Sequence, residues 1–191
     1  VTAVAAKAAF YRDHNDMVEQ TVMRLAEALD LAPAERETLR LASQLHDIGM
    51  VVMSNAVLSK KRLLTPAERQ QLRQHPAVAA QLLEQVPALR HLAPVVRHHH
   101  ECWDGSGYPD GLKDEAIPYL ARVLAVADAY GSLICDWPGQ MAGSPDAALA
   151  ALRAAAGTQL DPAIAQALVG TIVPAGATTA PDWFTPGVPG R

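Results

Sequence analysis

The segment RHHHECWDGSGYPDG, residues 97–111, places three histidines and a carboxylate directly before a turn rich in glycine, with a tyrosine and a proline. Imidazole nitrogens and carboxylate oxygens are donors that proteins offer to iron, manganese, zinc and nickel. A row of histidines is also compatible with a solvated helix end, since His-rich tracts occur in both settings. The other polar residues of the chain must decide between a metal site and a surface cluster.

Further residues of the same types lie at or near the ends of expected helices. His46 and Asp47 follow a core-like stretch, His75 precedes a proline, and Asp128 lies in an apolar segment. Singly, each histidine fits a hydrogen-bonded core or surface role, and Asp128 fits a cap or a pair with Arg122. Several helix ends that each deliver an imidazole or a carboxylate instead favour a metal site inside a helical bundle.

The adjacent pair His46 and Asp47 favours two ions rather than one. A carboxylate can bridge two ions while the neighbouring imidazole binds one of them. Two ions about 3.5–4 Å apart bind a phosphate ester and lower the pKa of a water between them, which prepares in-line hydrolysis. The predicted chemistry is therefore metal-assisted phosphoester hydrolysis.

The elements that must position these residues are all expected to be helices. Alanine and leucine dominate, and β-branched alternation is scarce. Thr65 followed by Glu68 predicts a capping box, and Pro76 predicts a kink or restart. The expected helices cover residues 17–29, 32–49, 65–86, 89–100, 118–134, 144–157 and 161–173. We expect one domain over 1–172 and a Pro/Gly-rich tail without a fold of its own over 173–191.

Composition excludes several classes of protein. The 191 residues are 50% hydrophobic, which permits one buried core, and the net charge of −4 is spread without a basic patch for duplex nucleic acid. No apolar run approaches the roughly 20 residues of a membrane span. Cys102 and Cys135 are single and distant, which predicts reduced thiols in a cytoplasmic protein. The start resembles no signal peptide and lacks methionine, so we expect a fragment of a longer protein.

Four motifs together resemble the HD-GYP family of bacterial signalling proteins. They are LHDIG at 45–49, HHECWDGSGYPDGL at 99–112, IPYLARVLAVADAY at 117–130 and GTQLDP at 157–162. The resemblance covers residues 14–168. It implies an all-α HD-domain helical bundle and hydrolysis of the second messenger cyclic di-GMP to pGpG or GMP. It also implies an upstream regulatory domain in the full-length protein.

The resemblance implies the following residue roles. Asp47 would bridge two divalent ions, with iron or manganese expected and zinc or nickel as alternatives. Phe10 stands where three-metal members carry a glutamate, so two ions are expected. His46, Asp47 and Glu101 would serve catalysis, Glu101 by orienting a ligand or the loop. The metal ligands would be His14, His46, Asp47, His75, His99, His100 and Asp128, and the GYP loop would comprise Asp104, Gly105, Gly107, Tyr108 and Pro109.

The chain departs from the family pattern where the substrate is expected to bind. Residues Met50, Arg122 and Trp137 are expected at the substrate, yet Met50 replaces a lysine and Trp137 an arginine. Each lost charge-assisted hydrogen bond to phosphate would cost roughly 1.5–3 kcal/mol. Two alternatives therefore stay open: a weakly active or inactive module that binds metal and acts by nucleotide sensing or protein contact, and a phosphohydrolase of another nucleotide.

Overall fold

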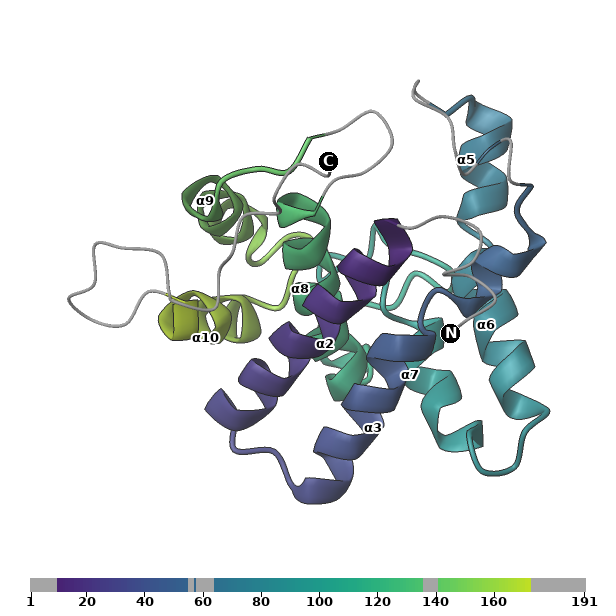
Figure 1. The fold of residues 1–191 in the computed structure, drawn as a ribbon, viewed down its shortest axis with the longest axis horizontal. Coiled ribbons are helices and arrows are strands. Elements are labelled where there is room, and N and C mark those ends of the chain that lie inside the picture. Colours follow the sequence, from purple (N-terminus) through teal and green to yellow (C-terminus); the bar gives the residue numbers. More distant parts are fainter. Residues whose placement is uncertain (1–9, 55–56, 58–63, 136–140, 173–191) are drawn as a thin grey trace, which may run out of the picture.

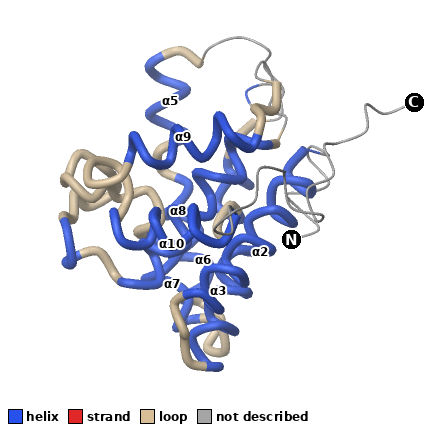
Figure 2. Tube along the Cα trace, turned by 90° about the vertical axis from the view of Figure 1, so that its left-hand side faces the viewer, coloured by secondary structure: helices blue, strands red, loops and turns tan. Residues whose placement is uncertain are grey.

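The computed structural model describes residues 10–54, 57, 64–135 and 141–172, and their elements are all helical. This confirms the all-α fold class. The α-helices are α2 (Phe10–Ala28), α3 (Pro33–Leu45), α5 (Pro66–Leu72), α6 (His75–Glu84), α7 (Ala93–Arg97), α8 (Tyr119–Ile134), α9 (Pro145–Ala155) and α10 (Pro162–Ile172). The 3-10 helices are η1 (Ile48–Val52), η2 (Arg90–Leu92) and η3 (Asp114–Ala116). Figure 2 shows helices and loops throughout the coloured trace.

Helices α2 and α8 pack against each other at the centre of the molecule. In Figure 1, α9 and α10 lie to one side of this pair, and α5, α6 and α7 lie to the other. Helix α2 buries Val18, Val22 and Leu25, which share one face at helical spacing. His14 lies one turn earlier on the same face, so α2 carries it into the interior.

Helix α2 begins about two turns before the residue at which we expected it to begin. The expected start was Met17, because residues 12–16 are mostly polar and hide the apolar period. The structure begins the helix at Phe10 and buries His14 and Asn15 at 1% and 8% exposure. A polar residue can occupy the buried face of a helix when its partners lie in the interior.

The structure confirms the capping box and the break at Pro76, and it corrects other boundaries. The Thr65 hydroxyl accepts from the Glu68 N–H at 3.3 Å, and the Glu68 carboxylate accepts from the Thr65 N–H at 2.9 Å. The helix expected to stop at Gly49 ends at Leu45, and η1 follows. The helix expected over 89–100 is wrong in extent, since η2 leads into the short helix α7, whose first turn contains Pro94.

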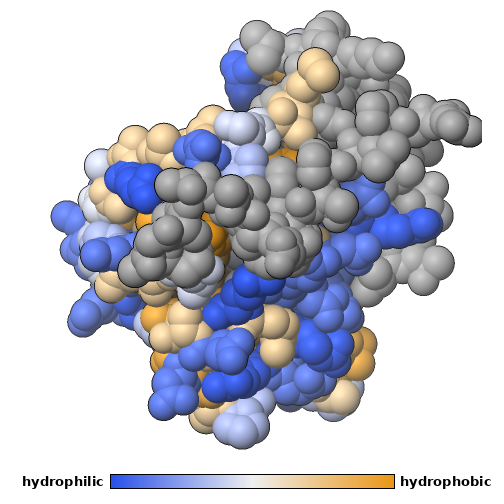
Figure 3. Space-filling model, turned by 60° about the vertical axis from the view of Figure 1, so that its left-hand side comes forward, coloured by the Kyte–Doolittle hydropathy of each residue, from blue (hydrophilic) through white to orange (hydrophobic). Residues whose placement is uncertain are grey.

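The core lies where α8 meets α2, α9 and α10. Helix α8 is buried on most of its surface, which explains why its sequence reads as nearly continuously apolar. None of the described helices combines the length and apolar character that crossing a membrane requires. On the coloured part of the face in Figure 3, hydrophobic side chains are scattered between hydrophilic ones. Trp137 and the tail at 173–191 lie outside the described residues.

Candidate metal centre

Two groups of three potential ligands lie in the interior of the helical bundle. The first group is His14, His46 and Asp128, and the second is His75, His99 and His100. Within each group the candidate ligand atoms lie within 4.8 Å of one another. Five segments that are distant in the sequence supply these residues, namely α2, the end of α3, α6, the end of α7 and α8. The structure thus brings together six of the residues that the sequence singled out.

Asp47 lies between the two groups. Its Oδ2 atom is 3.6 Å from His46 Nε2 in the first group, and its Oδ1 atom is 3.4 Å from His75 Nε2 in the second. Asp47 follows the end of α3 and directly precedes η1, so the change of chain direction there aims its carboxylate inward. Each carboxylate oxygen therefore faces one group, which is the arrangement that a bridging ligand needs.

Backbone carbonyls fix the orientation of three imidazoles. The Nδ1 atoms of His46, His75 and His99 lie 2.7, 2.9 and 2.6 Å from the carbonyl oxygens of the residues three positions earlier. A carbonyl only accepts hydrogen bonds, so Nδ1 must carry the proton in each ring. The Nε2 lone pair of each neutral ring is then directed into the cluster and is available to a metal.

Burial favours the uncharged form of all three histidines in the second group. It lowers the pKa values of His75 and His99, and neighbouring imidazoles lower that of His99 further. Burial also lowers the pKa of His100 to about 4, although Asp128 opposes the shift. Neutral imidazole is the form that binds a metal ion. The second group is therefore in a ligating state at neutral pH.

His14 and Asp128 form an ion pair in the first group. His14 Nε2 lies 3.0 Å from Asp128 Oδ1, and the exposed fractions of the two side chains are 1% and 13%. Burial opposes both charges, but the hydrogen bond between the partners raises the pKa of His14 and lowers that of Asp128. A metal ion bound here would take the place of the proton on His14 Nε2. Asp128 thus pairs with His14 rather than with Arg122, which donates to Asp161 at 2.8 Å.

The donor set fits divalent metal ions. His46 Nε2 is buried and has no hydrogen-bond partner among the described residues, a costly state that a cation would relieve. His75 Nε2 and His99 Nε2 lie only 3.4 Å apart, although neither ring has a proton to share there once Nδ1 is protonated. Mixed imidazole and carboxylate donors suit iron, manganese, zinc and nickel. The cluster can therefore bind metal.

Glu101 lies at the GYP loop rather than among the candidate ligand atoms. Its carboxylate is buried and accepts three backbone N–H groups, from Asp110 at 2.7 Å, Gly111 at 3.1 Å and Leu112 at 3.1 Å. Three donors around one carboxylate fix the path of the backbone. Of the two roles expected for Glu101, the structure favours orienting the loop.

The loop covers the cluster through Tyr108. Its ring stacks on His100 with centroids 5.0 Å apart, and the guanidinium of Arg73 lies 4.4 Å from the centroid of the same ring. Gly105 has φ +85°, and a Cβ on Gly107 would overlap the backbone of Cys102. Asp104 accepts from the N–H and hydroxyl of Ser106, which closes the turn. Pro109 follows a cis peptide bond.

Of the residues expected at the substrate, Met50 and Arg122 lie within the described part of the chain. Met50 is buried at 5% exposure in η1. Arg122 donates to Asp161 and to the carbonyl of Ile117, and its guanidinium lies over the rings of Trp103 and Tyr119. Two of its five N–H donors are thus used within the fold. Sequence reasoning missed Arg73, since an exposed arginine at a helix end carries no signal until Tyr108 is placed beside it.

Comparisons with known proteins show the family of the chain. The family described as HD domain matches residues 2–164. The chain is 40% identical over 152 residues to the "Cyclic di-GMP phosphodiesterase response regulator RpfG" of Xanthomonas campestris, covering 76% of this chain and 39% of the relative. It is 34% identical over 159 residues to "3'3'-cGAMP-specific phosphodiesterase 3" of Vibrio cholerae, covering 83% of this chain and 35% of the relative.

A solved structure supports the fold. Bd1817, an HDGYP protein from Bdellovibrio bacteriovorus, superimposes with a TM-score of 0.66 at 24% identity, covering 82% of this chain and 50% of that chain. The chain spans less than two fifths of the length of the two curated relatives described above.

Proposed function

The chain belongs to the HD domain family, in its HD-GYP branch, and from this premise we propose that it is a phosphodiesterase of cyclic dinucleotides, with cyclic di-GMP as substrate and pGpG or GMP as product. The observation that carries the proposal is the position of Asp47 between two groups of ligands. A phosphodiester needs charge neutralised on its phosphoryl oxygens, and a two-ion site is suited to that task.

The residues that would hold two divalent ions follow from the geometry. His14, His46 and Asp128 would hold one ion, and His75, His99 and His100 the other, with Asp47 shared. When bound, the ions would supply Lewis acidity toward the phosphate and a nucleophilic water at neutral pH. Iron or manganese is proposed, since both accept mixed imidazole and carboxylate ligands, as do zinc and nickel.

The residues of the chain itself would orient the ligands and admit the substrate. The carbonyl bonds to His46, His75 and His99 keep Nε2 pointing inward. His100 and Asp128 have the more exposed side chains in the cluster, at 28% and 13%. Substrate phosphate would therefore approach from their side, past Tyr108. Glu101 would keep the loop that carries Tyr108 in register.

A weakly active metal-binding module is the second candidate. It is favoured by Met50, which is buried and offers no charge to phosphate. We further propose that a regulatory domain accompanies this domain in a cytoplasmic full-length protein. The name "response regulator" of the Xanthomonas relative and its greater length support this.

The deciding experiment is a turnover assay on protein purified without oxygen, with metal counted on the same sample. Cyclic di-GMP, 3'3'-cGAMP and linear pGpG are supplied separately. Two ions per chain with cleavage of a cyclic dinucleotide is the expected result. Two ions without cleavage of any of the three compounds would contradict the proposed phosphodiesterase activity and favour the second candidate.

A further inference from the structure

A cavity of about 410 Å³ opens beside Asp128, on the side of α8 that faces α9. Its walls come from α8, from α9 and from the turn at 157–160, which belongs to the GTQLDP motif. Neither the ligand set nor the GYP loop accounts for this cavity. Because Asp128 forms part of its wall, anything bound there would touch the candidate metal centre.

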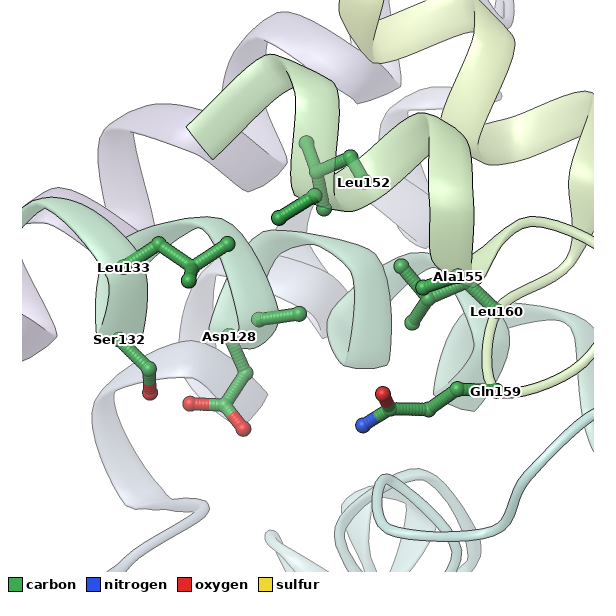
Figure 4. A pocket seen from close by; sticks show the side chains of 9 residues that line it. Asp128, Ser132, Leu133, Leu152, Ala155, Gln159 and Leu160 are labelled. Atoms are coloured by element: carbon green, nitrogen blue, oxygen red, sulfur yellow. The ribbon is translucent and has the colours of Figure 1, made fainter. Parts of the chain in front are cut away.

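The wall of the cavity combines apolar and polar side chains. Leu152, Ala155 and Leu160 lie along one side in Figure 4, while Asp128, Ser132 and Gln159 lie on the other. Flat aliphatic surfaces with a few placed polar groups are typical of small-molecule sites. A purine base has apolar faces and a polar edge, so it matches this division.

Gln159 is held in position by its backbone. Its N–H donates to the carbonyl of Ala155 at 3.0 Å, and its carbonyl accepts from the N–H of Trp103 at 3.1 Å. The neighbouring Thr158 carbonyl accepts from the N–H of Asp104 at 2.8 Å, which joins this turn to the start of the GYP loop. Although Gln159 is exposed, its backbone is thus fixed on both sides, and its amide is directed beside Asp128.

We propose that this cavity is a nucleobase subsite, in which one purine base of the cyclic dinucleotide lies against Leu152 and Leu160 while Gln159 and Ser132 bind its edge. The inference rests on the proposed function, since a phosphate at the metal centre places an attached nucleoside within reach of the cavity. A glutamine amide has an NH2 group that donates and a carbonyl oxygen that accepts, and a serine hydroxyl both donates and accepts. Gln159 is therefore a specificity-determining residue.

The test compares binding and turnover of three cyclic dinucleotides: cyclic di-GMP, 3'3'-cGAMP and cyclic di-AMP. Dissociation constants are measured by isothermal titration on metal-loaded protein. Bis(p-nitrophenyl) phosphate serves as a diester without a base, and metal content is counted throughout. The variants are Gln159→Ala and Gln159→Glu, with Gln166→Ala as the matched control, because Gln166 is an exposed glutamine on α10.

Gln159→Ala is expected to weaken dinucleotide binding about 10-fold, with metal content and hydrolysis of the base-free diester unchanged. Gln159→Glu is expected to raise the preference for cyclic di-GMP over cyclic di-AMP about 10-fold, since a carboxylate accepts both N–H groups of the guanine edge and repels the acceptors of adenine. Gln166→Ala should change neither.

A second variant tests the apolar wall. Ala155→Phe should fill the cavity from α9 and abolish dinucleotide binding, while the base-free diester is still cleaved. The subsite would be overturned if the dissociation constants and the base preference stayed the same in all Gln159 and Ala155 variants. A wild type that binds no dinucleotide would overturn it as well. A wild type that binds dinucleotides and cleaves none would contradict the proposed function alone.

Discussion

The orientation of single side chains in the candidate metal centre is fixed by their immediate neighbours. Histidine can present either ring nitrogen, and here carbonyl groups settle the choice for His46, His75 and His99. These carbonyls belong to the last turns of helices, where they have no partner within the helix. A histidine just after such a turn can donate to one of them, so its position at a helix end is also the cause of its orientation.

The bridging role proposed for Asp47 leads to a first prediction. Asp47→Asn replaces a carboxylate oxygen that faces His46 or His75 by an amide nitrogen, which cannot ligate a cation. We expect loss of at least one of the two ions and a fall in turnover of roughly 100-fold or more. Elemental analysis and the turnover assay measure both effects. Asp146→Asn, on the exposed first turn of α9, is the control. Full metal content in Asp47→Asn would refute the bridge.

The contacts of Glu101 lead to a second prediction, which distinguishes a role in orienting the loop from a role in binding metal. Glu101→Gln keeps the shape but turns an NH2 group toward backbone N–H donors. Losing a charge-assisted bond and leaving a donor unsatisfied should cost about 2 kcal/mol in the free energy of unfolding. Activity should fall with metal content unchanged. Denaturant titration and elemental analysis measure this, and a variant that loses metal while its stability is unchanged would show a direct role at the centre instead.

At the scale of elements, the close packing of η1 on α6 positions His75 relative to Asp47. A Cβ at Gly49 would overlap the carbonyl oxygen of His75 and lie 2.8 Å from the N–H nitrogen of Ala79. Gly49→Ala should therefore push the two elements apart and destabilise the fold by about 1–3 kcal/mol or more. Metal affinity should fall as well.

The matched control for Gly49 is Gly170→Ala on α10. Nothing lies within 4 Å of a Cβ at Gly170, so the same substitution should stabilise that helix by about 0.5–1 kcal/mol. Thermal denaturation of both variants gives the comparison. Equal stability of the two variants would show that η1 can move away from α6 at little cost.

The link between α7 and the GYP loop gives a prediction about pH. Arg97 donates two hydrogen bonds of 2.7 Å to Asp110, and together with a bond from His98 they lower the pKa of Asp110 to about 2. Because this pKa lies below the unfolded value of about 3.9, the pair adds stability above pH 4 and loses it as pH falls toward 2. Both side chains are about a third exposed, so we expect at most roughly 1 kcal/mol.

Asp110→Asn tests that pair. Its free energy of unfolding should fall below that of the wild type at pH 6, and the difference should shrink as the pH is lowered from about 4 toward 2. Chemical denaturation at each pH measures it. If the difference in the free energy of unfolding instead grew as the pH fell, Asp110 would not be its source.

The sequence predicted helices better than it predicted their ends. Proline and capping signals located the starts of α3, α5 and α9, since those signals act within a few residues. The start of α2 and the break into η2 and α7 depend on tertiary contacts, so periodicity missed them. The candidate ligands other than His14 could be predicted because His and Asp are unusual in an apolar helical sequence, whereas His14 was assigned only from the family resemblance. The cavity beside Gln159 could not be predicted from the sequence, since it forms only when α8, α9 and the turn at 157–160 meet.

For the molecule as a whole, metal bound at the candidate centre would connect segments that are far apart in the sequence. The candidate ligands come from the central helices α2 and α8, from α6 and from the ends of α3 and α7 (Figure 1). Their buried polar groups are costly without a cation. Metal binding should therefore stabilise the folded state of the entire domain rather than one element.

Chelation measures that stabilisation. A ligand that binds only the folded state at 100 times its Kd adds about 2.7 kcal/mol, which for a domain of this size corresponds to roughly 5–10 °C in Tm. We expect EDTA-treated protein to melt lower by at least this amount and to recover when manganese or iron is restored. In Asp47→Asn the shift should be smaller, because part of the ligand set is missing. An identical Tm with and without metal would mean that the ions are bound too weakly to connect these segments. Helix packing alone would then hold the seven candidate ligands in place.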